Sequence, residues 1–117
     1  MSEPAWLFVC PSAQDGWLQN LGQVMGAVLA LEPDQLSLLG ELAVRGAFED
    51  AAALPVAGFA FLAHGTPNAI RGNDRRELFD ASNAYLASGR HVYALACSSA
   101  SSLARSAVES GAVVYVG

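Results

Sequence analysis

Two apolar segments of the chain each end on a residue that can do nucleophilic or proton-transfer chemistry. Residues 56–63 (VAGFAFLA) run directly into His64, and residues 91–96 (HVYALA) run into Cys97. A cysteine thiolate is a nucleophile, and an imidazole can take the thiol proton or protonate a leaving amine. The pair would suit covalent acyl transfer if the fold brings the two side chains together.

The sequence around both residues is compatible with that chemistry. Cys97 precedes a predicted helix, so free backbone N–H groups and the positive end of the helix dipole would lie near its sulfur. Gly65 has no Cβ and lets the backbone approach a substrate, and the N–H groups of Gly65 and Cys97 could hold an oxyanion. Taken singly, each residue has a structural interpretation too: a buried cysteine is commonly a small hydrophobe, and a strand-end histidine a hydrogen-bonded structural residue.

Short apolar runs alternate with helical periodicity along the chain. The predicted strands cover residues 5–10, 35–40, 56–63, 91–96 and 112–116, and the predicted helices cover 12–31, 41–54, 73–88 and 98–110. Residues 35–40 could instead begin a helix, and 65–74 have the composition of a loop. Strand–helix alternation predicts parallel strands joined by right-handed crossovers. The expected fold class is α/β: a three-layer α/β/α sandwich with a mostly parallel sheet of about five strands, in a single domain spanning 1–117.

This architecture would place the two reactive residues together. In open parallel sheets, functional groups gather just beyond the carboxyl ends of the strands. If one helix connects the strands at 56–63 and 91–96, these strands can be neighbours. His64 and Cys97 would then emerge at the same edge of the sheet, a few ångströms apart.

Composition excludes several other classes of protein. With 53% hydrophobic and 15% charged residues, 117 residues suffice for one globular core. The net charge of −5 argues against a nucleic-acid-binding surface, and the cluster of Arg71, Arg75 and Arg76 is interleaved with acidic residues, as on a solvated helix face. No segment predicts a membrane span, a secretory signal or a nucleotide-binding loop. Two distant cysteines make no disulfide framework, so we expect a cytoplasmic protein.

Two further residues have side chains that could do chemistry, or could be structural. Cys10 ends the first predicted strand, where it could join His64 and Cys97 as a third soft zinc ligand. No CxxC or HxxxH spacing supports such a site, so a buried structural thiol is preferred, and neither a metal nor a cofactor is expected. His91 opens its strand at the opposite edge and is expected to be structural or exposed.

Candidate substrate-binding residues follow the predicted strands. Asp15 lies in the loop after the first strand and could pair with a basic substrate side chain, although a helix N-cap or first-turn carboxylate explains it equally well. Ser98 directly follows Cys97 and is the second candidate.

The chemistry-bearing segments resemble a known family. FAFLAHGTPN (59–68) followed by VYALACSSASSLARSAVESGAVVYVG (92–117) is similar to the His-Gly and Ala-Cys signatures of caspase-like (clan CD) cysteine peptidases, above all the bacterial CHAT branch. LSLLGELAVRGAFEDAAALPVAGFAFLAHG (36–65) resembles that branch as well. The resemblance implies a caspase-haemoglobinase-like fold, His64 and Cys97 as a catalytic dyad, the Gly65 amide in the oxyanion hole and a protein or peptide substrate.

The sequence departs from the family in two ways. The family domain normally continues beyond the strand matching AVVYVG, so the chain could be the large-subunit portion, completed by a second polypeptide or a homo-oligomer. CSSASS also replaces the Glu/His-Ser-Gly pattern common after the nucleophile, which bears on substrate preference.

Two alternative functions remain open. One is a catalytically inactive caspase-like module that pairs through an exposed sheet edge. The other is a relative of the tetrapyrrole metal chelatases, because FLAHGT also resembles their apolar-His-Gly motif. That family would not need Cys97.

Overall fold

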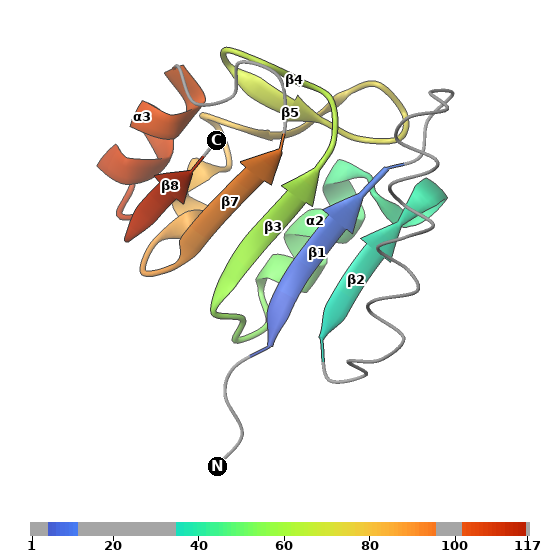
Figure 1. The fold of residues 1–117 in the computed structure, drawn as a ribbon, viewed down its shortest axis with the longest axis horizontal. Helices are drawn as coiled ribbons and strands as arrows, with labels where there is room; N and C mark the ends of the chain where they lie inside the picture. Colours follow the sequence, from blue (N-terminus) through green and yellow to red (C-terminus); the bar gives the residue numbers. More distant parts are fainter. Residues whose placement is uncertain (1–4, 12–34, 96–101, 117) are drawn as a thin grey trace.

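A five-stranded parallel sheet forms the centre of the molecule (Figure 1). The computed structural model describes residues 5–11, 35–95 and 102–116. The strands of this sheet are β1 (Trp6–Cys10), β2 (Leu36–Leu39), β3 (Gly58–Leu62), β7 (His91–Leu95) and β8 (Val114–Val116), in the order β2-β1-β3-β7-β8. The α/β class and the five predicted strands are therefore confirmed, including the segment at 35–40 that could have begun a helix.

Helices cover one face of this sheet. The α-helices are α2 (Arg45–Ala52) and α3 (Ser102–Glu109), and two short 3-10 helices are η1 (Gly40–Leu42) and η2 (Ala84–Ala87). Side chains of α2, η2 and α3 belong to one buried cluster with β1, β3 and β7. The predicted helices at 41–54 and 98–110 are thus confirmed in shorter form. The helix predicted over 12–31 lies outside the described residues.

The prediction of a helix over 73–88 is wrong. The chain between β3 and β7 forms a small antiparallel sheet of β4 (Gly65–Thr66), β5 (Ala69–Arg71) and β6 (Glu77–Asp80), followed by η2. Local turn chemistry explains the difference. The Asp74 side chain accepts the N–H of Arg76 at 3.1 Å, and the N–H of Gly72 donates to the Arg76 carbonyl at 2.9 Å. These bonds close a β5–β6 turn where a helix would otherwise begin.

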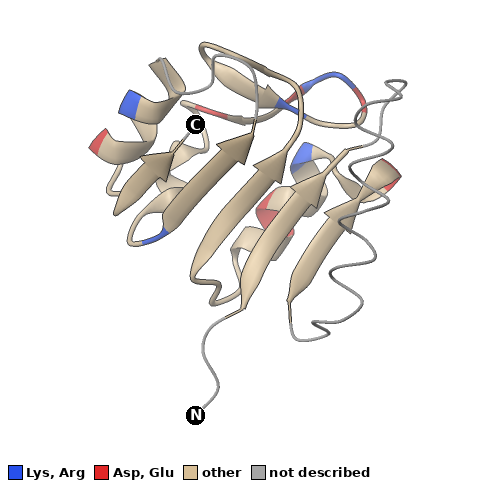
Figure 2. Cartoon of the chain, viewed as in Figure 1, with Lys and Arg blue, Asp and Glu red and all other residues tan. Residues whose placement is uncertain are grey.

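This turn also corrects the interpretation of the arginine cluster. Arg71 lies in β5, and Arg75 and Arg76 lie in the turn, with Arg75 at a φ of 66°. All three side chains are exposed, as predicted, but they belong to a hairpin and not to a helix face. Figure 2 shows the basic residues of this turn beyond the carboxyl ends of the main sheet.

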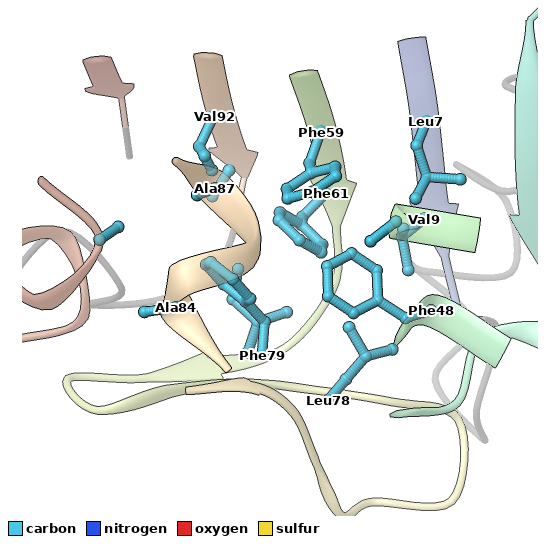
Figure 3. Close-up of a cluster of buried hydrophobic side chains, with 14 of the residues drawn as sticks. Leu7, Val9, Phe48, Phe59, Phe61, Leu78, Phe79, Ala84, Ala87 and Val92 are labelled. Carbon is cyan, nitrogen blue, oxygen red and sulfur yellow. The ribbon is translucent and has the colours of Figure 1, made fainter. Parts of the chain in front are cut away.

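Four phenylalanines join the helix layer to both sheets. Phe48 of α2 contacts Phe59 and Phe61 of β3 with ring centroids 5.1 and 5.5 Å apart, and Phe79 of β6 at 5.7 Å. Phe61 stacks on Phe79 at 5.3 Å. Figure 3 shows these rings between the strands and the hairpin. The antiparallel sheet is therefore packed onto the main sheet through the same core that α2 buries.

The opposite face of the main sheet is mostly apolar as well. By the strand registers it carries the polar residues Ser37 and His91 beside a majority of apolar ones, namely Trp6, Phe8, Ala60, Leu62, Tyr93, Leu95, Val114 and Val116. None of the five strands contains a charged residue. The most exposed of these apolar residues lie on β7 and β8: Tyr93 is 45% exposed, Leu95 57% and Val116 50%.

A polar network joins α2 to the end of β6. The Arg45 guanidinium donates to both carboxylate oxygens of Asp80, at 3.0 and 3.3 Å, and Asp80 also accepts the N–H and the hydroxyl of Ser82. The buried Asn83 receives the Asp80 N–H and donates to the Leu78 carbonyl. Partial burial alone would raise the pKa of Asp80, but the hydrogen bonds from Arg45 and Ser82 outweigh it and hold that pKa below its ordinary value.

Asp80→Asn should lower the free energy of unfolding by about 1–2 kcal/mol at pH 7, a modest loss because the ion pair is partly exposed. The folded pKa of Asp80 lies below the unfolded one, near 3.9, so its contribution is complete above that value and is lost as pH falls through the folded pKa. Urea unfolding between pH 7 and pH 2.5 measures this. The difference in the free energy of unfolding between wild type and Asp80→Asn should shrink as the pH falls over that acidic range. Asp50→Asn, on the exposed side of α2, should show no comparable loss of stability at pH 7.

Candidate functional site

His64 lies at the carboxyl edge of the main sheet, two residues beyond the end of β3 and one before β4. The order in which the strands are added to the sheet changes direction at β1. β2 lies on one side of β1, and β3, β7 and β8 follow on the other side. This reversal is the switch point at which open parallel sheets commonly bind ligands. The side chain of His64 is exposed at that edge.

The backbone of His64 is fixed by the hairpin that follows it. The Arg71 N–H donates to the His64 carbonyl at 2.8 Å, directly before the β4–β5 pairs Gly65–Ile70 and Thr66–Ala69. Residues opposite each other in an antiparallel ladder project on the same side. Arg71 is therefore the cross-strand neighbour of His64.

Arg71 is a site residue that the sequence analysis missed. Its guanidinium is exposed, and within the described parts of the chain it forms no ion pair. Glu77 of β6 lies opposite Arg71 on its other side, so a basic and an acidic residue are neighbours here. The turn-forming residues Thr66, Pro67 and Asn68, directly after Gly65, were the signal that could have predicted this hairpin.

Cys97, Ser98 and Asp15 lie outside the described residues, and so does the remainder of the segment 96–101. Both flanks of that segment are described. The Ala63 N–H donates to the carbonyl of Leu95 at 3.2 Å, and the Leu103 N–H donates to the carbonyl of Pro67 at 2.8 Å. The chain that carries His64 thus bonds to β7 on one side of the segment and to α3 on the other. Figure 1 shows β4 and β5 beyond the ends of β3 and β7, next to α3.

Gly65 begins β4, where the ladder determines the direction of its amide. Because the His64 carbonyl already accepts from Arg71, the alternation of antiparallel pairs turns the Gly65 N–H away from β5. That N–H is oriented outward from the hairpin, as an oxyanion donor would have to be.

Cys10 is a buried thiol with no sign of reactivity. It is 2% exposed, and burial raises its pKa to about 11. Within residues 5–11, 35–95 and 102–116, no three His, Cys, Asp or Glu side chains gather as a metal site would require. The preference for a structural thiol over a zinc ligand agrees with this burial.

His91 lies at the start of β7, at the opposite end of the sheet from His64. Its ring is half-buried and makes an edge contact with Trp6, with centroids 6.3 Å apart. The expectation of a structural or exposed histidine is consistent with this position.

None of the helices in the described part of the chain is both long and apolar enough to cross a membrane. In comparisons with known proteins, no family model, no curated protein and no solved structure matches the chain.

Proposed function

We propose that the chain is a caspase-like cysteine peptidase domain of the CHAT-like kind, with Cys97 as nucleophile and His64 as general acid and base. One observation carries the proposal. Residues 63–67, which include His64, hydrogen-bond to both flanks of the segment that contains Cys97. Cys97 is two residues along the chain from Leu95, the nearer of these two bonded flanks.

The register of the two strands supports the same pairing. Leu62 of β3 lies opposite Leu95 of β7 in the parallel ladder. Positions 64 and 97 each follow this last pair by two residues in the sequence. Neighbouring strands are about 4.8 Å apart, and residues two apart project on the same face. A thiol and an imidazole at these positions would be within reach of one another.

The proposed reaction uses only groups of the protein and water. His64 accepts the Cys97 proton, and the thiolate adds to the peptide carbonyl, whose oxyanion is held by the N–H groups of Gly65 and Cys97. The C–N bond then breaks as the imidazolium gives its proton to the leaving amine, which leaves a thioester. Water, deprotonated by His64, hydrolyses the thioester and releases the carboxylic acid and the thiol. Asp15 and Ser98 remain the candidate substrate-binding residues.

The finer parts of the fold belong to the same proposal. All-parallel sheets are covered on both faces, and the second face here is mostly apolar. The crossover from β1 to β2 runs in the opposite direction along the sheet from the crossovers that follow, and right-handed crossovers in opposite directions lie on opposite faces of a parallel sheet. We therefore propose a three-layer, caspase-haemoglobinase-like domain, acting in the cytoplasm on a protein or peptide substrate.

The inactive interaction module is the second candidate, and the β8 edge favours it. β8 is the outer strand of the described sheet, and its segment AVVYV (112–116) contains neither charge nor proline. Val113 is 60% exposed and Val116 50%. Such an edge lacks the usual protection against pairing with another strand, so a second polypeptide or a second copy of the chain could add to it.

Alkylation of the two cysteines separates these functions. At pH 6, the Cys97 thiol should react with iodoacetamide about tenfold faster than an unperturbed thiol. An ordinary cysteine is almost wholly protonated at pH 6. An adjacent imidazolium or helix N-terminus lowers the pKa of a thiol to between about 3.5 and 7.5. A thiol of low pKa is also a weaker nucleophile, which offsets part of this gain and leaves a net increase in the alkylation rate of roughly tenfold. Mass spectrometry of the alkylated protein from pH 4 to 10 gives the rate and its pH midpoint.

The chain provides its own controls for this experiment. Cys97→Ala retains only Cys10, whose pKa of about 11 leaves roughly one thiolate in a hundred thousand at pH 6, so this variant should stay unlabelled. His64→Ala should move the midpoint toward 8.5. If Cys97 titrates near 8.5 in both wild type and His64→Ala, the dyad does not exist and the interaction module is the better explanation.

A further inference from the structure

We infer that the turn between β5 and β6, which carries the exposed side chains of Arg71, Arg75 and Arg76, is a docking site for an acidic polypeptide segment. These three residues are called the basic turn below. The turn lies beyond the carboxyl ends of the main-sheet strands, the edge at which open parallel sheets commonly bind ligands (Figure 2). The inference goes beyond the proposed function and does not depend on it, because docking requires neither a thiol nor an imidazole.

The guanidinium groups of the basic turn have no role in holding the fold together. Within the described parts of the chain they form neither ion pairs nor hydrogen bonds. Two other arginines show the contrast. Arg45 donates to the Asp80 carboxylate, and Arg90 donates to three backbone carbonyls with its guanidinium over an aromatic ring. Those two groups join elements of the fold, whereas the three in the turn are available to a ligand.

The backbone of the turn is attached to the body of the protein. The N–H of Asn73 donates to the carbonyl of Ala43, between η1 and α2, at 2.7 Å. A Cβ on Gly72 would lie 2.7 Å from the same oxygen, so glycine permits this close approach. Inside the turn, the N–H of Arg75 donates to the Gly72 carbonyl at 3.0 Å. A ligand that docks on a backbone fixed in this way pays less conformational entropy than one that must order a loose loop.

Arg75 has a backbone conformation that is unfavourable for a long side chain. Its φ is 66°, and no other non-glycine residue in the described ranges has a positive φ. Glycine, asparagine or aspartate adopts this left-handed conformation at a lower cost. Because the Arg75 side chain is exposed and has no partner, the fold gains nothing visible from it. Backbone strain of this kind is found mainly at functional positions, and the guanidinium is the group that a ligand would use.

The charges around the turn favour a polypeptide over a nucleic acid. The Debye length is about 10 Å at an ionic strength of about 0.1 M, so a docked ligand interacts mainly with the local charges and less with the net charge of −5. Two carboxylates interrupt the basic turn: Asp74 accepts the N–H of Arg76 at 3.1 Å, and Glu77 lies opposite Arg71. They would repel the continuous charge of a phosphate backbone. Spaced carboxylates on a peptide can pair with the guanidinium groups and avoid them.

Fluorescence anisotropy with a labelled peptide of alternating Glu and Gly residues tests this inference. In an extended peptide, side chains on the same side are about 6.8 Å apart, so several carboxylates can reach one turn. The wild type should bind this peptide, and the affinity should fall as salt is raised from about 20 to about 200 mM. The same peptide with Gln in place of Glu should bind at least about tenfold more weakly, the sum expected for three exposed ion pairs.

Variants of the turn separate binding from stability. Arg75→Gly removes one guanidinium and relieves the backbone, so it should weaken binding about two- to fivefold while the melting temperature stays constant or rises. Replacement of Arg71, Arg75 and Arg76 together by Gln should weaken binding at least about tenfold. Arg105→Gln removes an exposed arginine of α3 and is the matched control, which should bind within about 1.5-fold of wild type.

Several results would overturn the docking site. Equal binding of the Glu and Gln peptides, or no binding of either at about 1 mM, would show that the turn does not recognise carboxylates. Unchanged affinity in the triple variant would place the peptide elsewhere on the surface. An oligothymidylate that binds more tightly than the Glu peptide would make the turn a phosphate-binding surface instead. None of these measurements involves hydrolysis or alkylation, so their failure leaves the proposed function untouched.

Discussion

Cys97→Ala should lower the rate of peptide-amide hydrolysis by at least about 10³-fold, and His64→Ala should lower it by about 10²–10⁴-fold. The first change removes the atom that forms the thioester. The second removes the group that takes the thiol proton and returns it to the leaving amine. A mixture of fluorogenic peptidyl coumarin amides, with every residue type at the position before the scissile bond, measures both losses whichever residue the enzyme prefers there.

The second cysteine and the second histidine of the chain are the matched controls. His91 lies at the start of β7, at the opposite end of the sheet from His64, and the side chain of Cys10 is buried at the end of β1. Cys10→Ala and His91→Gln should therefore hydrolyse the mixture at close to the wild-type rate while folded. Hydrolysis that survives in Cys97→Ala would contradict the assignment of the nucleophile. A wild type that alkylates rapidly but hydrolyses none of the peptides would restrict the proposal to thiol activation.

The parallel sheet could be predicted because its strands carry their own signal. β1, β3 and β7 are continuous apolar runs, which are typical of strands in parallel sheets, and each is separated from the next by a turn or a helical period. The position of His64 followed from the same signal, since it ends the run that becomes β3. The bounds of the helices were less well predicted, because helix ends depend on capping and packing beyond the local sequence.

Residues 65–88 could not be predicted from periodicity because their packing breaks it. Ile70 lies opposite Phe79 and Arg71 opposite Glu77, so Leu78 is an extra residue in a β-bulge. Leu78 and Phe79 are consecutive and both fully buried, which violates the alternation expected of a strand and imitates a helix. The hairpin is stabilised by its turn at Asp74 and by tertiary contact with α2.

The candidate site was predictable only to the extent that its elements were. His64 followed from one apolar run, whereas its neighbour Arg71 depended on the hairpin that the periodicity concealed. The partnership of His64 with Cys97 remains a prediction. Adjacent strands and two flanking hydrogen bonds favour it, and those contacts join residues about thirty positions apart in the sequence.

Phe48→Ala should lower the free energy of unfolding by about 3–5 kcal/mol, the range found when a buried phenylalanine is truncated. Phe48 is fully buried, and its ring contacts those of Phe59, Phe61 and Phe79. These rings come from three layers of the fold: α2, the main sheet and the antiparallel sheet. Rigid strands and a stacked Phe61–Phe79 pair leave little freedom to collapse into the space, so a cavity term adds to the lost burial.

Urea unfolding followed by circular dichroism measures this loss, and two variants test its cause. Tyr85→Ala removes an aromatic ring that is 62% exposed on η2, and should change stability by no more than about 0.5 kcal/mol. Phe48→Leu refills most of the volume and should recover more than half of the loss. A loss below about 1 kcal/mol in Phe48→Ala would show that α2 does not pack on the two sheets through this ring. The antiparallel sheet that carries His64 would then need another attachment to the main sheet.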